Sequence, residues 1–306
     1  MVSEIDGFCK IQHLYKSFDK TEALKGVSFE VKKGEIFGLI GPDGAGKTTL
    51  FRILTSLLLP DRGEGKIGAL DVVYDYKKIR KSVGYMPQRF SLYQDLSVEE
   101  NLSFFAQIFG TTIEENYHLI RDIYQQIEPF KDRLAKNLSG GMKQKLALSC
   151  ALIHKPDFLV LDEPTTGVDA VSRKEFWDML IQLKKSGLTI LVATPYMDEA
   201  NLCDRVALIQ KGEILSVNTP EELTKNYPDR LFAIKSANLY RLIEDLKKSY
   251  EIKTVFPFGE YLHITLKYPE NSEELSGILR EKGHTEIVLK EISAGIEDCF
   301  MSLMMR

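Results

Sequence analysis

The sequence lacks a cysteine framework, a long apolar run and a signal-peptide pattern, and each absence excludes a class of protein. Its four cysteines have neither metal-ligand spacing nor the spacing of a disulfide framework, which favours free thiols in a reducing cytosol: Cys9, Cys150, Cys203 and Cys299. No apolar stretch approaches the roughly 18 residues that span a bilayer. The first residues, Met1 to Cys9, carry acidic groups where a signal peptide has an apolar core. We therefore expect a soluble, cytoplasmic protein.

An excess of positive charge is also missing. The chain has 40 Lys and Arg residues against 44 Asp and Glu residues, which gives a net charge of −4 and a pI near 5.9. We expect no nucleic-acid partner at this charge, although a local basic patch is compatible with it. With 306 residues, 44% of them hydrophobic and 27% charged, the composition is that of a globular chain long enough for two domains of unequal size.

One glycine-rich stretch carries the clearest chemical signal. Residues 41–49 read Gly-Pro-Asp-Gly-Ala-Gly-Lys-Thr-Thr and lie between the apolar runs 36–40 and 50–54, which predicts a strand, a loop and a helix. In a P-loop of this kind, curled backbone N–H groups and the helix N-terminus point at phosphate oxygens. Lys47 would reach the β- and γ-phosphates, and the Thr48 hydroxyl would bind Mg²⁺. The expected nucleotide-binding residues are Gly41, Asp43, Gly44, Ala45, Gly46, Lys47, Thr48 and Thr49. An ordinary glycine-rich turn is the weaker alternative.

Three further motifs follow along the chain. Residues 83–88 predict a short strand that ends at Pro87 and is followed by Gln88, and the Ser97 to Glu100 stretch predicts a capping box that opens a helix. Residues 138–144, Leu-Ser-Gly-Gly-Met-Lys-Gln, predict a helix N-terminus that favours an anion. The apolar run 158–161 ends in two acids, as in a buried parallel strand with chemistry at its carboxyl end. Alone, each motif has a plainer interpretation as a helix cap or a turn.

In this order, the motifs resemble those of the ATP-binding subunits of ABC transporters over roughly residues 8–217. The resemblance implies ATP and Mg²⁺ as cofactors. Asp162 would hold Mg²⁺ through a water, Glu163 would polarise the attacking water, and Gln88 would touch Mg²⁺ or that water. Phe18 would stack on adenine, with packing in the core as the alternative. The implied metal ligands are Thr48, Gln88 and Asp162.

The resemblance also implies that such a chain works as a dimer. Ser139, Gly140 and Gly141 would bind the γ-phosphate held by the opposite subunit. Asp169, in the Thr-Gly-Val-Asp stretch after the two acids, would face that subunit across the interface. The implied catalytic residues are Glu163, Gln88, Lys47 and Asp169.

Two residues depart from the family's pattern. Pro195 stands where the family ordinarily has a histidine that donates to the γ-phosphate, and proline lacks both a side-chain donor and a backbone N–H. Asp43 places a carboxylate beside the expected triphosphate, where the family has an uncharged polar residue. We therefore expect a degenerate site in this chain and a heterodimer with a complete second ATPase subunit, with a homodimer of two slow sites as the alternative.

The expected fold class is α/β. Residues 8–226 would form an ABC ATPase domain, a P-loop NTPase with an antiparallel β subdomain, a RecA-like mixed sheet and a helical subdomain at about 89–155. Residues 229–306 predict a βαββαβ order, a small α+β ferredoxin-like domain, followed by an apolar last helix expected to pack on its own domain. The resemblance implies that the helical subdomain docks on a membrane partner. Four apolar residues there fit docking and core packing equally well: Phe90, Leu92, Tyr93 and Leu96.

The combination of motifs resembles the first ATPase half of tandem bacterial exporters of the ABC-2, or multidrug, type. It implies an ATPase subunit on the inner face of the membrane that powers an ABC-2 type permease by nucleotide-dependent dimerisation. One alternative is an ATP-binding regulatory clamp that hardly hydrolyses, for which Pro195 would be the reason. Another is a soluble ABC ATPase outside transport, which the single ATPase unit and the absent basic surplus disfavour.

Overall fold

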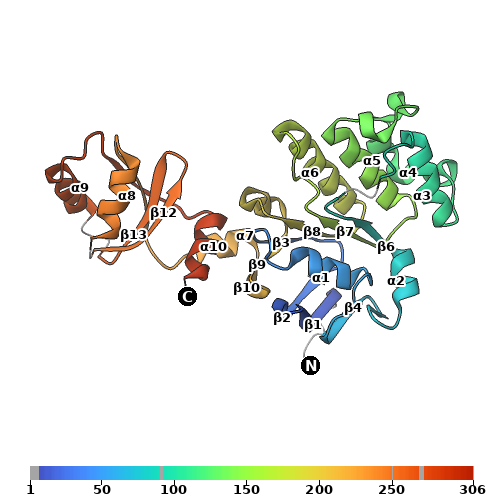
Figure 1. Cartoon of the computed structure of the whole chain (residues 1–306), viewed down its shortest axis with the longest axis horizontal. Coiled ribbons are helices and arrows are strands. Elements are labelled where there is room, and N and C mark those ends of the chain that lie inside the picture. The colour runs from blue at the N-terminus through green and yellow to red at the C-terminus, as the bar shows by residue number, and fades with distance from the viewer. Residues whose placement is uncertain (1–6, 90–91, 250, 269–271, 306) are drawn as a thin grey trace. The chain divides into compact units, whose positions relative to one another are not determined.

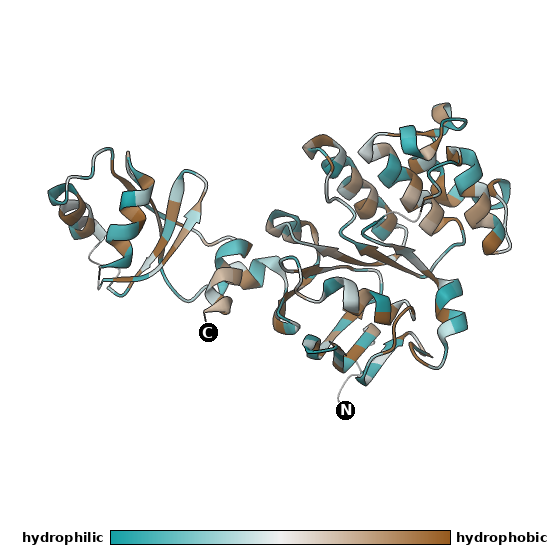
Figure 2. Ribbon diagram, viewed as in Figure 1, coloured by the Kyte–Doolittle hydropathy of each residue, from teal (hydrophilic) through white to brown (hydrophobic). Residues whose placement is uncertain are grey.

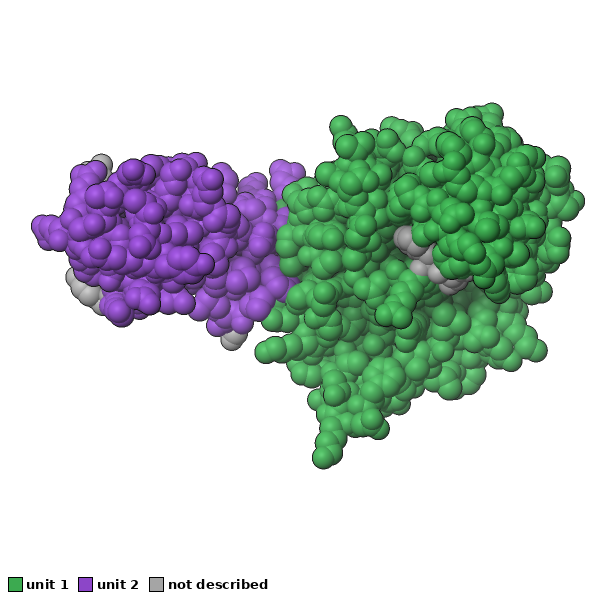
Figure 3. Space-filling view, turned by 45° about the horizontal axis from the view of Figure 1, so that its top comes forward, with its two compact units in different colours: residues 1–220 green, residues 221–306 purple. Residues whose placement is uncertain are grey.

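The computed structural model describes residues 7–89, 92–249, 251–268 and 272–305. They belong to two compact units, one reaching to Pro220 and the other starting at Glu221, which Figure 3 colours separately. None of the helices in these described ranges combines the length and the apolar composition that crossing a bilayer requires.

The first unit contains an antiparallel sheet of four strands in the order β2-β1-β4-β5. The two long strands β1 (Gly7–Phe18) and β2 (Thr21–Lys32) pair antiparallel, as the alternating apolar and polar residues of both segments predict. The shorter strands β4 (Arg62–Ile67) and β5 (Leu70–Asp71) extend the sheet from β1. The buried face of this sheet packs into the main core of the unit through residues such as Ile11 and Val31.

The second sheet of this unit has six strands in the order β10-β9-β3-β8-β7-β6 (Figure 1). All neighbours are parallel except β9 and β10. The strands are β3 (Ile36–Ile40), β6 (Val83–Met86), β7 (Phe158–Asp162), β8 (Thr189–Thr194), β9 (Arg205–Gln210) and β10 (Glu213–Asn218). Every residue of β3, β7 and β8 is buried, which agrees with their largely apolar composition, brown in Figure 2; the polar residues Asp162, Thr189 and Thr194 stand at the strand ends. Because parallel strands end at the same edge, the loops after β3, β6, β7 and β8 meet there.

Six α-helices complete the first unit as described. They are α1 (Lys47–Leu54), α2 (Tyr76–Ser82), α3 (Val98–Ile108), α4 (Ile113–Tyr124), α5 (Gly140–Leu152) and α6 (Ala170–Lys185), with short 3₁₀ turns at Glu128–Phe130, Ala135–Asn137 and Met197–Leu202. Helices α3, α4 and α5 pack against one another (Figure 1) within the residues expected to form the helical subdomain. The predicted capping box at the start of α3 is confirmed: the Ser97 side chain accepts from the Glu100 N–H, and the Glu100 carboxylate accepts from the Ser97 N–H.

The second unit has one antiparallel sheet in the order β12-β13-β11-β14. Its elements are α7 (Pro220–Lys225), β11 (Leu231–Lys235), α8 (Leu239–Lys247), β12 (Ile252–Phe258), β13 (Tyr261–Leu266), α9 (Ser272–Glu281), β14 (Val288–Ile292) and α10 (Ile296–Met304). The βαββαβ order and this strand order are those of a ferredoxin-like domain, as predicted. Its own core includes Phe232, Leu242, Leu262 and Ile264.

The last helix, α10, packs within the second unit. Ile296, Cys299 and Phe300 are buried, whereas Met304 is 41% exposed. The Cys299 thiol donates to the Leu223 carbonyl of α7 (3.3 Å), so α7 belongs with the residues that follow it. The unit therefore starts at Glu221, within the first turn of α7. The sequence changes in composition at residues 226–229 and on that ground predicts a boundary after this helix.

Candidate nucleotide-binding site

The glycine-rich loop lies between β3 and α1, where the sequence predicts it. Gly44 (φ 76°) and Gly46 (φ 105°) adopt left-handed backbone conformations that favour glycine, and α1 begins at Lys47 directly after them. At Gly41 a Cβ atom would lie 2.2 Å from the Ile209 carbonyl oxygen. The loop thus curls around the start of α1, where backbone N–H groups and the helix N-terminus favour an anion.

Lys47 lies buried in the centre of this loop, with 3% of its surface exposed. Its ammonium group donates to the carbonyls of Gly41 (2.8 Å) and Pro42 (3.0 Å). It also forms an ion pair with Glu163 Oε1 (2.9 Å). Every partner of this charge is an oxygen atom, the kind of ligand that a phosphate group supplies.

Asp162 ends β7 and faces the start of α1. Its Oδ1 accepts from the Thr48 hydroxyl (3.1 Å), while its Oδ2 is buried without a hydrogen-bond partner among the described residues. Burial, with a smaller contribution from the charge of Glu163, raises the pKa of Asp162 to about 6. A hydroxyl beside a carboxylate with one unused oxygen is a donor set that suits Mg²⁺ with bound water, so these residues fit the metal that the resemblance implies.

Glu163 follows in a left-handed backbone conformation (φ 51°), which is uncommon for glutamate and marks a residue held by its surroundings. Its N–H donates to the Ala193 carbonyl of β8 (3.0 Å). Its Oε2 accepts from Gln88 Nε2 (2.7 Å) and, more weakly, from the Thr166 hydroxyl (3.4 Å). The structure therefore brings Gln88, Glu163 and Lys47 together from three separate segments of the chain.

A cavity of about 780 Å³ opens beside the P-loop, lined by the loop, by Gln88 and Glu163, and by residues that sequence reasoning missed. Three of these are Lys20, Lys25 and Lys211. The turn that carries Lys211 is fixed to the loop, since Gly212 N donates to Ala45 O (3.0 Å) and Lys25 N donates to Gly212 O (2.8 Å). No motif marks these lysines, because only the pairing of distant strands brings them to the cavity.

Phe18 ends β1 next to the segment that enters this cavity. Its side chain is 46% exposed, so it does not pack in the core, which was the alternative to a role in stacking. Thr21, Glu22 and Ala23 line the cavity a few residues further along the chain. An exposed aromatic ring in this place is compatible with stacking on a flat ligand.

The signature stretch and Asp169 lie at the starts of two helices and do not line the P-loop cavity. Ser139 caps α5 by accepting from the Met142 N–H (3.3 Å). Asp169 caps α6 by accepting from the N–H groups of Val171 (3.1 Å) and Ser172 (3.0 Å), and the bond from Ser172 is the largest cause that lowers its pKa. The two helix starts are close, because a Cβ atom on Gly141 would lie 2.7 Å from Ser172 Oγ. Within one chain the structure thus does not bring Ser139, Gly140, Gly141 and Asp169 to the cavity.

Pro195 directly follows β8, at the edge where the P-loop and Glu163 lie. The preceding Thr194 accepts the N–H of Gly41 at its carbonyl (3.4 Å) and the N–H of Tyr196 at its hydroxyl (3.1 Å). The Arg173 guanidinium lies over the Tyr196 ring (4.9 Å). The backbone at this position is therefore well fixed, but it presents no hydrogen-bond donor.

A glycine loop that opens a helix, a buried lysine and two carboxylates at the end of another parallel strand of the same sheet define a P-loop nucleotide-binding protein. The family profile described as "ABC transporter" matches residues 24–166. Over 299 residues the chain is 34% identical to the "Nod factor export ATP-binding protein I" of Burkholderia lata, with 95% of each chain covered. The chain belongs to the family of ABC transporter ATP-binding proteins.

Other members of the family are similar over different lengths. The "Probable multidrug ABC transporter ATP-binding protein YbhF" of Escherichia coli is 37% identical over 278 residues, which cover 90% of this chain and 48% of that protein. The chain thus spans about half the length of that relative. Among solved structures, cbiO1 from Clostridium perfringens, described as part of the ABC transporter complex cbiONQ, matches with a TM-score of 0.65 and 30% identity over 71% of this chain and 90% of its own. This likeness confirms the predicted ABC ATPase fold.

Proposed function

We propose that the chain binds and hydrolyses MgATP as the ATPase subunit of a membrane exporter. The observation that carries the proposal is the convergence of Lys47, Glu163 and Gln88, held by bonds of 2.9 and 2.7 Å beside the P-loop cavity. Few other functions require a buried lysine, a carboxylate and an amide at that place. The relatives whose names include Nod factor export and a multidrug transporter support export as the task.

In this mechanism the P-loop N–H groups and Lys47 hold the β- and γ-phosphates. Thr48 and Asp162 would hold Mg²⁺, which would neutralise part of the negative charge of the phosphates. Glu163 accepts a proton from the attacking water while Gln88 orients both groups. The water oxygen then bonds to the γ-phosphorus as the bond to ADP breaks.

Dimerisation completes the site in this proposal. Ser139 and Gly141 lie at an α5 N-terminus that favours an anion but does not line the chain's own cavity, which supports a role toward the γ-phosphate on a second subunit. Asp169 is exposed at the start of α6 near this helix, a position that suits contact across such an interface.

Pro195 supports a division of labour between the two subunits. A donor to the γ-phosphate in the transition state is worth about 3 kcal/mol by analogy with oxyanion donors, roughly a hundredfold in rate, and Pro195 offers none. We infer a heterodimer in which the partner's P-loop and this chain's signature form the faster site. A homodimer is the competing arrangement.

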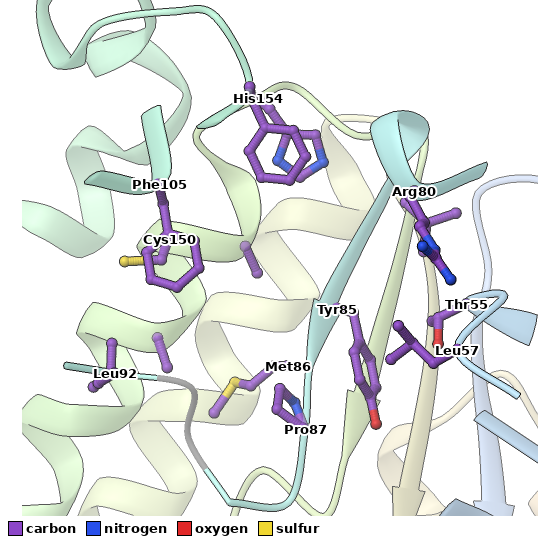
Figure 4. Close-up of a pocket in the computed structure, with 14 residues that line it drawn as sticks. Thr55, Leu57, Arg80, Tyr85, Met86, Pro87, Leu92, Phe105, Cys150 and His154 are labelled. Atoms are coloured by element: carbon purple, nitrogen blue, oxygen red, sulfur yellow. The ribbon is translucent and has the colours of Figure 1, made fainter. Parts of the chain in front are cut away.

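An apolar pocket of about 180 Å³ near Gln88 supports docking of a permease helix (Figure 4). Met86 and Pro87 line it from the end of β6, Leu92 from the following loop and Phe105 from α3. Of the candidate docking residues, Leu92 is 8% exposed, Leu96 is half-buried and Tyr93 is 49% exposed, so the core role suits Leu92 and the docking role suits Tyr93. Phe90 lies outside the described residues. A partner that fills this pocket would touch the segment that carries Gln88, so its movement could reach the ATP site. The resemblance makes an ABC-2 type permease the proposed partner, with the chain on the inner face of the membrane.

The experiment is steady-state ATPase activity of the purified chain beside its Glu163→Gln and Pro195→His variants, with ATP binding measured separately. We expect ATP binding in all three, slow turnover in the wild type, a rate near background for Glu163→Gln and a rate about a hundredfold higher for Pro195→His. A fast wild type that Glu163→Gln inactivates would support the homodimer. ATP binding without turnover in both the wild type and Pro195→His would support the regulatory clamp.

A further inference from the structure

A basic and aromatic surface patch surrounds α2, away from the residues assigned to ATP. Seven exposed side chains form this α2 patch: Leu57, Leu59, Tyr74, Tyr76, Lys77, Arg80 and Lys81. In the described part of α2 only Ile79 is buried, so one side chain of the helix packs in the core and the others are exposed or half-buried. None of the seven lines the P-loop cavity, and two of them, Leu57 and Arg80, also line the apolar pocket near Gln88.

The charge of the patch contrasts with that of the chain. Residues 76–82 contain four basic side chains and no acid, whereas the whole chain has a net charge of −4. Lys77 and Lys81 are four residues apart, so they project from the same side of the helix, opposite Ile79. Neither forms an ion pair with a described residue, while the neighbouring Lys78 pairs with Asp75 (3.1 Å). Two lysine charges are therefore available to a partner.

Exposed apolar side chains lie on the segments joined to this helix: Tyr74 shortly before it, and Leu57 and Leu59 just after Ser56, whose carbonyl accepts from Arg80. Tyr74 is 85% exposed, Leu59 is 62% exposed and Leu57 is 55% exposed. The Tyr76 ring lies beneath the Arg80 guanidinium (5.4 Å) and near the Lys77 ammonium (5.9 Å). Tyrosine and leucine beside lysine match the interface of a bilayer, where amphipathic rings and cationic side chains both have favourable surroundings.

The patch is held in place and continues into the apolar pocket. Arg80 donates to the Ser56 carbonyl (2.6 Å), and the Ser56 hydroxyl donates to the Val72 carbonyl (2.7 Å), so α2 and the loop before Leu57 are fixed to each other. Leu57 and Arg80 also line the pocket, as Figure 4 shows. A partner in this pocket and a membrane beneath the patch would thus occupy adjoining surfaces of one face.

We propose that the α2 patch binds the surface of a membrane that contains anionic lipids. An anionic bilayer suits both the basic and the apolar residues of the patch. Lipid phosphates attract Lys77 and Lys81, and Tyr74 and Leu59 can enter the headgroup region. The proposal rests on the proposed function only in placing this face toward a permease. It makes direct lipid contact a second attachment of the subunit to the membrane.

The test is flotation of the purified full chain with phosphatidylcholine vesicles, with and without phosphatidylglycerol. We expect binding only with phosphatidylglycerol and weaker binding as the salt concentration rises. Each basic residue near an anionic surface adds to the free energy of membrane binding, so Lys77→Glu with Lys81→Glu should weaken vesicle binding at least about tenfold. Lys77→Arg with Lys81→Arg should retain it.

A matched control reverses two exposed lysines of the second unit, Lys247→Glu with Lys248→Glu, and should bind like the wild type. Equal losses in the two charge-reversal variants, or equal binding to neutral vesicles, would overturn the proposal. Binding of RNA through the same lysines, with no vesicle binding, would make the patch a nucleic-acid surface instead. ATP binding is measured in the same samples: ATP binding without vesicle binding overturns this proposal alone, and the reverse result overturns the proposed function alone.

Discussion

At the scale of single residues, the two adjacent acids at the end of β7 meet different surroundings. Glu163 faces a lysine at 2.9 Å and an amide at 2.7 Å. Asp162 faces one hydroxyl, and its second oxygen has no hydrogen-bond partner in the part of the chain that the structure describes. The Lys47 ammonium thus lies directly beside the carboxylate proposed to accept the proton of the attacking water. Asp162 has a pKa raised to about 6, so a cation beside it would recover the cost of its buried charge.

Asp162→Asn should therefore stabilise the ligand-free chain near neutral pH. A carboxyl whose pKa is higher in the folded than in the unfolded state stays protonated to a higher pH when the chain is folded. The free energy of unfolding therefore falls as pH rises from about 4 to about 6. Asparagine does not titrate. Relative to wild type, the variant should gain up to about 2 to 3 kcal/mol of unfolding free energy between pH 4 and pH 7. Urea unfolding of both proteins at several pH values measures this difference.

A difference that stays constant with pH would contradict the raised pKa. Added MgATP supplies a second check, because the metal should stabilise wild type at pH 7 and leave Asp162→Asn largely unchanged. Thr48→Val is the control, since it removes the hydrogen bond to Asp162 without removing the titrating group.

Local sequence patterns were enough to name these residues as candidates, but they did not give all of the contacts that the side chains make. A glycine loop before a helix, or two acids after an apolar run, is a contiguous signal. The contact of Gln88 with Glu163 spans 75 positions and depends on β6 lying beside β7, which no single segment encodes. Lys211 was not predicted as a site residue, because only contacts between distant segments bring it to the cavity. Pro195 differs from these residues, because its proposed effect comes from a hydrogen-bond donor that it lacks and not from a contact that it makes.

At the scale of elements, Asn101 fixes the segment between β6 and α3. It is fully buried, and its Nδ2 lies within hydrogen-bond distance of the carbonyls of Tyr93 (3.0 Å), Leu96 (3.2 Å) and Ser97 (2.9 Å). Its Oδ1 accepts from the Tyr93 N–H (2.8 Å). One side chain thus forms hydrogen bonds with several backbone groups of a short loop that borders the pocket proposed for the permease. The capping box of α3 was predictable from spacing, but this role was not, because an asparagine inside a helix carries no such signal.

Asn101→Ala should destabilise the first unit by about 2 to 4 kcal/mol, because it leaves several buried backbone groups without a partner. It should also increase hydrogen exchange at the Tyr93 amide before global unfolding. Gln94→Ala is the control on the same segment, since Gln94 donates only one long bond of 3.4 Å and should be nearly neutral. Equal effects of the two substitutions on exchange would show that Asn101 has no special role in this loop.

At the scale of the whole molecule, the chain divides into units that fold around separate cores. The first unit's core includes Leu39, Val160 and Leu191, and the second has its own core on a four-stranded sheet. The strand order of that sheet follows from its βαββαβ sequence, so both fold and topology were accessible without coordinates. The boundary between the units could not be read from the sequence in the same way, because it depends on which core α7 packs against. A helix of six residues gives little indication of that in its composition.

The boundary leads to a prediction about fragments. A fragment of residues 219–306 keeps α7, whose Leu223 is 7% exposed and accepts the thiol of Cys299 from the buried side of α10. A fragment of residues 229–306 lacks α7 and with it the Leu223 carbonyl that accepts from the buried Cys299, so it should unfold at a lower temperature by several degrees and bind more of a hydrophobic dye. The two fragments are compared by circular dichroism melting and dye fluorescence, with the full chain as reference. Because the ferredoxin-like sheet and its core are present in both, both fragments should show a cooperative transition. Equal melting temperatures would mean that α7 adds nothing to the second unit and that the composition shift marks the true boundary.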